Sequence, residues 1–546
     1  MVYDLLIIGG KIIDGTGSPW YWGDVAVQNG RIAAIGRLAD APARRVIQAD
    51  GRIVSPGFID MHTHSDLQLL ANPLHECKIR QGVTTDVLGH DGLGLAPVTP
   101  RVAALLREQL AGWNGRTDVE WDWNTVTQYL DRFDRRAAVN VSMLVPHGTI
   151  RLIVMGEDNR PPTERELGLM RALVDGAMRE GAFGLSTGLT YAPAMFADDD
   201  EVVELCKALK PYGGAYVPHH RNYGMEALKG YGDSIEIGRR AGVAVHLTHC
   251  HLGFPVNKNR APELLQIIDN ARAAGVEVTL DTYPYLAGNT YLHSLLPGWV
   301  HDGGSQAILS RLQSPDLRPR IRHEMEVTGS DGFHGVPLGW EMITIAGISS
   351  GDDTGIVGLS LPEAAARAGQ ETFDFFCDLL IRTQLGVSCL AFIGNEENVQ
   401  AILQHPAHMV GSDGILTGER PHPRGWGAHT RFLAHYTRDL GLLTWEEAIR
   451  KMTSAPARRI GCLDRGILRP GLAADLVVFD PDTVRDTATY ESPRRYPEGI
   501  HYVAVNGTLV VDDEQITGET PGRALREVYS RVPERMVELP VSEGWV

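Results

Sequence analysis

The sequence has no apolar run of about 18 residues, which is the length that a membrane-spanning helix needs. It also has no cluster of lysine and arginine, and its formal net charge is −17 at pH 7, so it offers no basic surface for nucleic acid. The remaining composition, with 43% hydrophobic and 22% charged residues over 546 positions, is typical of a globular protein. We therefore expect no membrane partner and no nucleic-acid partner.

Cysteine is scarce as well, and its distribution argues against a disulfide scaffold. The six cysteines are scattered, with no CxxC pair and no disulfide-like spacing. At the N-terminus, MVYDLLIIGG carries Asp4 where a signal peptide needs basic residues, and its short apolar run stops at two glycines. These features predict reduced thiols and a cytoplasmic location.

The two ends of the chain share one pattern, in which short β-rich runs alternate with turn signals. Asn29-Gly30 lies between the runs DVAVQ and RIAAIG, and Asn506-Gly507 lies between HYVAV and TLVVDD. Asn-Gly between alternating apolar runs is a strong hairpin signal. We predict that residues 1–56 and 461–546 together form a small β-sandwich domain.

The middle of the chain, about residues 57–460, follows a different pattern. Amphipathic segments that end at glycine, such as ERELGLMRALVDGAMREG and SIEIGRRAG, are followed by apolar runs of strand length. At least six such units fit here, which favours a closed, parallel, TIM-type (β/α)8 barrel of the α/β class over an open sheet. The stretch from about 288 to 339 is rich in glycine and proline and breaks the pattern, so we predict a lid-like insertion over the barrel mouth.

Several predicted barrel strands end in a residue that can bind a metal. In PGFIDMHTHSD, His62 and His64 are two apart and therefore face the same side of an extended strand. The residues at the strand ends are His62 and His64 after FID, His90 and Asp91 after TTDVLG, His219 after GAYVP, His249 after VAVHLT, and Asp413 after HMVGS. Because barrel strands present their carboxyl ends at one face, these residues predict a metal site there.

Imidazole and carboxylate ligands suit Zn²⁺ better than Mg²⁺ or Ca²⁺. One open tetrahedral site cannot use all five of the terminal ligands, which are His62, His64, His219, His249 and Asp413. We therefore expect two zinc positions about 3.5 Å apart, or one tight and one weak position, and thus one or two bound zinc ions. A carbamylated lysine is an improbable bridge, because Lys207 and Lys210 lie in a predicted helix. Asp91 is the preferred bridging ligand and His90 is its rival, while the alternative for Asp91 is a turn cap.

A zinc site of this kind predicts attack of water on an amide. Zinc lowers the pKa of water and polarises a carbonyl oxygen. Asp413 is the candidate catalytic residue, because a carboxylate there can take a proton from water and pass it to the leaving nitrogen. The alternative is that Asp413 acts as a metal ligand only, and it can serve in both roles.

The motifs HTHSD, FGLSTGLTYAP, VPHHR, LTHCH, DTYPY, LLPGW and GSDG followed by HPRGWG occur in this order along nearly the whole chain. With them the sequence resembles the amidohydrolase superfamily, and within it the D-aminoacylase group of N-acyl-D-amino-acid deacylases. The resemblance implies a distorted TIM-type barrel with a β-sandwich and zinc-dependent hydrolysis of an N-acyl bond. It places the metal histidines at His62, His64, His219 and His249, and the catalytic aspartate at Asp413.

The resemblance also implies a site for the substrate α-carboxylate. Its residues fall on Tyr191, His251, Tyr283 and Arg424, of which Arg424 offers a planar fork to a carboxylate. Packing at the barrel top is the alternative for the two tyrosines. Two positions depart from the family: Asp91 replaces the usual bridging cysteine, and His251 replaces a lysine. The second change leaves open a substrate without a free α-carboxylate.

We therefore hold three hypotheses. The leading one is a zinc amidohydrolase that cleaves a linear amide, deacylating an N-acyl-D-amino acid or a similar small molecule. The second uses the same metal site to open a cyclic amide or imide, or to cleave another amide. The third is a scaffold protein without catalysis, which is expected to have lost ligands, whereas all of them are in place here. The sequence leaves the oligomeric state open, with a homo-oligomer among the options.

Overall fold

The computed structural model describes residues 2–349 and 353–526, in which eight strand positions close into a parallel barrel. Residues Met61 and Val410 close the ring, because the Met61 amide donates to the Val410 carbonyl oxygen at 3.2 Å. The barrel strands are β6 (Phe58–Asp60), β7 (Val83–Leu88), β8 (Asn140–Met143) continued by β9 (Val145–Pro146), β10 (Gly184–Gly188), β11 (Ala215–His219), β12 (Ala244–Leu247), β13 (Val278–Thr282) and β17 (His408–Val410). The predicted barrel is confirmed.

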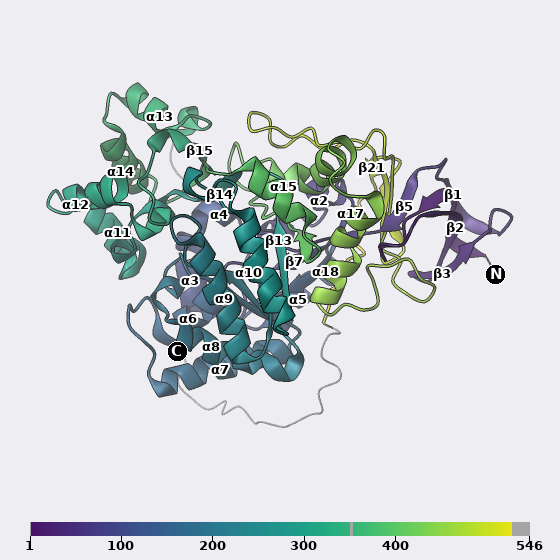
Figure 1. Ribbon diagram of the computed structural model, residues 1–546, viewed down its shortest axis with the longest axis horizontal. Helices are drawn as coiled ribbons and strands as arrows, with labels where there is room; N and C mark the ends of the chain where they lie inside the picture. Colours follow the sequence, from purple (N-terminus) through teal and green to yellow (C-terminus); the bar gives the residue numbers. More distant parts are fainter. Residues whose placement is uncertain (1, 350–352, 527–546) are drawn as a thin grey trace.

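Amphipathic helices pack around the barrel (Figure 1). They are α6 (His147–Met155), α7 (Glu164–Arg179), α8 (Asp199–Cys206), α9 (Ala227–Ala241), α10 (Ala261–Ala273), α15 (Glu396–Gln404) and α17 (Trp445–Met452). Helix α7 begins at a capping box between Thr163 and Glu166, and α9 ends at Gly242, whose φ of 70° suits a glycine cap. No helix in the described part of the chain is both long and apolar enough to cross a bilayer.

The strands near the two ends of the chain join in one nine-stranded sheet. Strand β5 (Ile53–Pro56) pairs antiparallel with β18 (Leu476–Phe479) and so links the two ends. The other strands are β1 (Tyr3–Ile12), β2 (Tyr21–Gln28), β3 (Arg31–Gly36), β4 (Ala43–Gln48), β19 (Ile500–Val505), β20 (Thr508–Asp512) and β21 (Gln515–Ile516). Both Asn-Gly pairs form hairpin turns with positive φ, and the sheet encloses its own apolar core, as the predicted β-sandwich requires.

The predicted domain limits remain a prediction. Residues 527–546, which the prediction assigns to the sandwich, lie outside the described residues, as do residues 1 and 350–352. Before that point the chain returns to the barrel, because the Leu525 amide donates to the Val141 carbonyl oxygen of β8 at 2.8 Å. The C-terminal segment therefore contacts both the sheet and the barrel.

A separate unit is inserted between β13 and β17. It contains the antiparallel strands β14 (Ala287–Tyr291), β15 (Ile343–Ile348) and β16 (Val387–Phe392), and the helices α11 (Gly304–Gln313), α12 (Arg318–His323), α13 (Leu361–Ala368) and α14 (Thr372–Arg382). The unit has its own apolar core and lies on the opposite side of the barrel from β1–β3 (Figure 1). It includes the predicted insertion at about 288–339 and continues to Phe392.

Candidate metal centre

The predicted ligands meet at the carboxyl ends of the barrel strands. His62 and His64 follow β6, Asp91 follows β7, His219 ends β11, His249 follows β12, and Asp413 follows β17. They form two groups that share Asp91: one is His62, His64, Asp91 and Asp413, and the other is Asp91, His219 and His249. Within each group, one ligand atom from every residue lies within 4.8 Å of the others. The structure therefore brings all of these side chains together.

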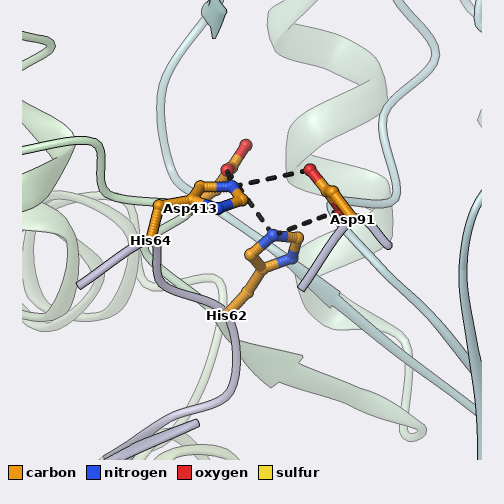
Figure 2. Close-up of side chains that lie close together, drawn as sticks. All are labelled: His62, His64, Asp91 and Asp413. Atoms are coloured by element: carbon orange, nitrogen blue, oxygen red, sulfur yellow. Dashed lines mark hydrogen bonds and ion pairs between the residues drawn. The ribbon is translucent and has the colours of Figure 1, made fainter. Parts of the chain in front are cut away.

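Figure 2 shows the first group. The Nε2 atom of His64 lies 3.0 Å from Asp413 Oδ1 and 3.5 Å from Asp91 Oδ2. The Nε2 atom of His62 lies 3.6 Å from Asp91 Oδ1 and 3.6 Å from Asp413 Oδ1. All four side chains are buried. Two imidazole nitrogens and two carboxylates therefore surround one small space.

The second group lies on the other side of Asp91. The Nδ1 atom of His219 is 3.5 Å from Asp91 Oδ2, and the Nε2 atom of His249 is 3.5 Å from Asp91 Oδ1. The two imidazoles approach each other to 2.9 Å between His219 Nδ1 and His249 Nε2. Each carboxylate oxygen of Asp91 thus faces one histidine of each group, so this residue lies between the two histidine pairs.

His90, the rival of Asp91, lies in neither group. Its ring stacks on the His62 ring, with 3.9 Å between ring centroids and 15° between planes. The turn Gly89-His90-Asp91-Gly92 directs Asp91, but not His90, into the ligand groups. In it, Gly89, Asp91 and Gly92 have positive φ values of 77°, 53° and 70°. A side chain at Gly92 would meet the Gly188 amide nitrogen at 2.6 Å, so the tight turn that aims Asp91 requires glycine there.

Three candidate ligands share a strained backbone. Asp91, His249 and Asp413 have φ values of 53°, 28° and 50°, in a region that residues with side chains rarely adopt. Such strain persists only where the surrounding structure holds it, and it concentrates at functional sites. The backbone at these three strand ends is therefore shaped to direct side chains into the centre.

The electrostatics of the centre favour positive charge. Burial alone would raise the pKa of Asp91, but His249, His219 and His62 hold it well below the ordinary value of an aspartate. Burial likewise opposes a charged Asp413, yet Arg424, His62 and the hydrogen bond from His64 lower its pKa. Burial lowers the pKa of His64, and the Asp413 and Asp91 carboxylates more than reverse this, raising it to about 9. Two ionised carboxylates in a buried site attract a cation.

The hydrogen bonds of the centre are also incomplete. Among the described residues, both ring nitrogens of His62 and the Oδ1 atom of Asp91 are buried without a hydrogen-bond partner. Buried polar atoms of this kind are rare in folded proteins and call for an explanation. Imidazole and carboxylate atoms that converge without a hydrogen bond, as those of His62 and Asp91 do, fit a zinc site.

A second layer of residues, which the sequence reasoning missed, fixes the ligands. Asp281 Oδ1 accepts a hydrogen bond from the His249 amide at 2.9 Å and lies 3.6 Å from His62 Nδ1. Its Oδ2 atom lies 2.9 Å from His246 Nε2. Asp281 opens the DTYPY motif at the end of β13, so its place at a strand end was a signal that could have found it.

A buried lysine joins the ends of β6 and β17. Lys78, which is fully buried, donates to the Asp60 carboxylate and, at 2.6 Å, to Ser412 Oγ. Asp60 Oδ1 in turn accepts from the Ser412 amide at 2.8 Å and from the His62 amide at 3.2 Å. These bonds hold the residues next to His62 and Asp413 in register, and no sequence pattern indicated them.

A cavity opens over the two groups, and three of the four predicted carboxylate-binding residues, Tyr191, His251 and Tyr283, line it. Tyr191 Oη lies 3.1 Å from Thr290 Oγ1. The His251 ring is 4.2 Å from the Tyr283 ring, and burial, with the nearby His249 and Arg424, lowers the pKa of His251 to about 3. This imidazole is therefore neutral, unlike the lysine that it replaces.

The fourth predicted residue, Arg424, lies behind Asp413. Its Nη1 atom is 2.9 Å from Asp413 Oδ2, and its guanidinium stacks on the Tyr283 ring at 4.4 Å. The side chain is fully buried. The structure thus places Arg424 against Asp413 and Tyr283, both of which line the cavity, while Arg424 itself is not among the lining residues.

A parallel barrel with histidine and aspartate side chains gathered at its strand ends defines the class of metal-dependent barrel hydrolases. A sequence model of the "Amidohydrolase family" matches residues 45–511. The chain belongs to this family, and within it to the D-aminoacylase group. The predicted resemblance is confirmed.

Two curated relatives from Alcaligenes xylosoxydans xylosoxydans match over nearly full length. D-aminoacylase is 38% identical over 528 residues, which cover 96% of this chain and 97% of the relative. N-acyl-D-aspartate deacylase is 36% identical, with 96% and 95% covered. Among solved structures, N-acyl-D-glutamate deacylase from Bordetella bronchiseptica, a complex with zinc and a phosphonate inhibitor, is 35% identical with a TM-score of 0.81, covering 96% of this chain and all of that one.

Proposed function

We propose that this chain is a zinc-dependent hydrolase that removes the acyl group from N-acyl-D-amino acids. The observation that carries the proposal is the Asp91 carboxylate, which lies between two histidine pairs at the base of a cavity. The relatives support it, because D-aminoacylase is 38% identical over 96% of the chain. The reaction breaks the carbon–nitrogen bond of a linear amide. This amide is not a peptide bond of a protein.

The two groups of side chains would each hold one zinc ion. His62, His64 and Asp413 supply one position, His219 and His249 supply the other, and Asp91 contributes an oxygen to both. Zinc, when bound there, supplies Lewis acidity that polarises a carbonyl oxygen and lowers the pKa of water to about 7. Whether one or both positions fill depends on the affinity of a carboxylate bridge, since the family usually has a thiolate at Asp91.

Asp413 moves the proton in the proposed reaction. Its carboxylate accepts a proton from the water whose oxygen attacks the amide carbon. When the carbon–nitrogen bond breaks, Asp413 returns the proton to the nitrogen, which leaves as the free amine of the amino acid. Arg424, at 2.9 Å from Asp413 Oδ2, keeps this carboxylate ionised and ready to accept the proton.

The substrate carboxylate would bind next to Asp413. Arg424 and Tyr283 form one stacked pair there, and His251 lies against Tyr283. Tyr191, held by Thr290, faces the same cavity. Because His251 is neutral, Arg424 is the charged partner in this set, so carboxylate binding depends on it more than it would with a lysine nearby.

The cavity wall favours an uncharged amino-acid side chain. Phe254, Leu286, Leu295, Phe333 and Ile393 line it. Arg424 lies behind Asp413 and is assigned to the α-carboxylate, and within the described residues no lysine or arginine lines the cavity itself. A second carboxylate, as in N-acyl-D-aspartate or N-acyl-D-glutamate, would therefore be buried without a counter-charge. The chain should therefore prefer apolar D-amino acids, such as leucine and methionine.

A substrate panel tests this function. We expect zinc-loaded protein to release acetate from N-acetyl-D-leucine and N-acetyl-D-methionine with kcat/KM at least about 10²-fold above the D-aspartate and D-glutamate derivatives, since an unpaired buried charge costs several kcal/mol. The N-acetyl-L-amino acids and a cyclic imide serve as matched controls. Hydrolysis of the cyclic imide alone would replace this proposal with the second hypothesis.

Four further features belong to the proposal. The proposed domain limits are 1–56 with 461–546 for the sandwich and 57–460 for the barrel, and the proposed role of the insertion at about 288–339 is to exclude water from the cavity. The location is the cytoplasm, which the scattered spacing of the six cysteines, with no disulfide-like pattern, supports. The partner is a small-molecule amide substrate.

A further inference from the structure

His334 is far in sequence from the candidate metal ligands, yet it lines the same cavity. It belongs to the inserted unit, and with Gly332 and Phe333 it forms part of the wall that also contains His219, His249 and Asp91. The mechanism above gives this imidazole no role. A histidine brought to the cavity by an inserted segment therefore needs an explanation.

The backbone of His334 is tied to the barrel independently of its side chain. Its carbonyl oxygen accepts a hydrogen bond from the Met225 amide at 3.0 Å and another from Asn222 Nδ2 at 3.1 Å. Met225 and Asn222 lie in the loop after β11, the strand that ends at His219. Because these hydrogen bonds use the backbone carbonyl, a substitution of the His334 side chain leaves them intact. The insertion therefore stays bonded to the barrel loop in such a variant.

The imidazole is held in place by aromatic contacts, and its Nδ1 atom lacks a hydrogen-bond partner among the described residues. Its ring packs edge-on against Tyr223 at 5.4 Å and against Phe254 at 5.9 Å, measured between ring centroids. Among the described residues, the Nδ1 atom is buried without a hydrogen-bond partner. The φ of His334 is 58°, a left-handed value that a histidine adopts only at some cost. An oriented, half-buried ring that lines the cavity and has an unpaired Nδ1 atom fits a ligand contact.

The cavity has two polar sides. On one side Arg424 touches Asp413 and stacks on Tyr283, with His251 adjacent, and the substrate carboxylate is proposed to bind there. On the other side Tyr223 packs against His219 at 4.9 Å and against His249 at 5.2 Å, and His334 lies beyond Tyr223. A substrate with its carboxylate near Arg424 and its amide over Asp91 would have its acyl half on the side of the cavity that Tyr223 and His334 line.

We propose that the imidazole of His334 donates a hydrogen bond to the acyl carbonyl oxygen of the substrate. This inference rests on the proposed function. A neutral imidazole has one N–H, and a donor aimed at a carbonyl oxygen stabilises the negative charge that develops there during attack. The inserted unit thereby supplies a group that touches the reacting amide, in addition to covering the cavity.

The first test compares His334→Ala with His323→Ala, an exposed histidine of the same insertion, in α12. We expect His334→Ala to lower kcat/KM for N-acetyl-D-leucine about 10²-fold, mainly through kcat, because it removes one donor to the developing charge. His334→Asn, which tolerates left-handed φ and keeps an N–H donor, should recover part of the loss. Zinc content and melting temperature should match the wild type in every variant.

The second test separates binding from turnover. In zinc-loaded Asp413→Asn protein, adding His334→Ala should weaken binding of N-acetyl-D-leucine about tenfold, measured by calorimetry, and leave binding of D-leucine unchanged because D-leucine has no acyl group. Equal affinities for N-acetyl-D-leucine with and without His334 would overturn the inference, as would an unchanged kcat in an active His334→Ala enzyme. A wild type that deacylates no N-acyl-D-amino acid overturns the proposed function instead, and the binding result then still decides the contact.

Discussion

Asp413→Asn is expected to lower kcat for N-acetyl-D-leucine about 10³-fold, in the range that general acid–base groups contribute. An amide has the size of the carboxylate but cannot accept a proton from water or return it to the leaving nitrogen. Asp413 is well placed for this role, because it lines the cavity and contacts His64 at 3.0 Å and Arg424 at 2.9 Å. Steady-state kinetics with measured zinc content checks this expectation.

The control for this variant is Asp269→Asn. Asp269 is a surface carboxylate that contacts His405, another histidine, at 3.1 Å, and it lies outside the cavity. The Asp269→Asn variant should keep the wild-type kcat. This result would show that losing a His–Asp contact does not by itself lower turnover. If Asp413→Asn with a normal zinc content retained more than about a tenth of the wild-type kcat, Asp413 would be a ligand and not the proton carrier.

Asp91→Ala is expected to have the second large effect, on zinc binding itself. Each Asp91 oxygen lies 3.5–3.6 Å from two histidines, so the variant removes a shared donor from both groups at once. We expect bound zinc to fall below one ion per chain and kcat/KM to fall by at least about 10²-fold, since metal catalysis contributes several kcal/mol. Elemental analysis after dialysis, together with kinetics, measures both quantities.

Two neighbouring variants sharpen the Asp91 test. Asp91→Cys puts a thiolate, the bridge usual in the family, in the same place and should restore zinc binding. His90→Ala should retain zinc, because His90 stacks on His62 and belongs to neither ligand group. The opposite pattern, with zinc lost in His90→Ala and kept in Asp91→Ala, would make His90 the bridging ligand.

Much of this centre could be predicted because the signal was local. Each candidate ligand ends a barrel strand or follows one by at most a few residues, and a parallel barrel gathers strand ends at one face. The same logic applied to Asp281 at the end of β13, but in the DTYPY motif the family resemblance implied a role only for Tyr283. The hairpins at Asn29-Gly30 and Asn506-Gly507 were equally local, since two adjacent residues determine the turn.

Other features depend on contacts between distant parts of the chain, which no short pattern records. The inserted unit extends to Phe392 because β14 pairs with β16, about 100 residues later, so a change of composition near residue 339 could not mark its end. The bond from Lys78 to Ser412 joins residues 334 positions apart. Likewise, the resemblance placed Arg424 at the substrate carboxylate, and only the three-dimensional structure brings its guanidinium against Asp413.

The most direct test of the whole account is diffraction at the zinc absorption edge from crystals of zinc-loaded protein. The account predicts anomalous peaks at one or both positions beside Asp91, within about 2.0–2.2 Å of the nearest histidine nitrogens and carboxylate oxygens. A first peak is expected among His62, His64, Asp91 and Asp413, and a second among Asp91, His219 and His249. Crystals that show these side chains well ordered with no anomalous peak among them would contradict it.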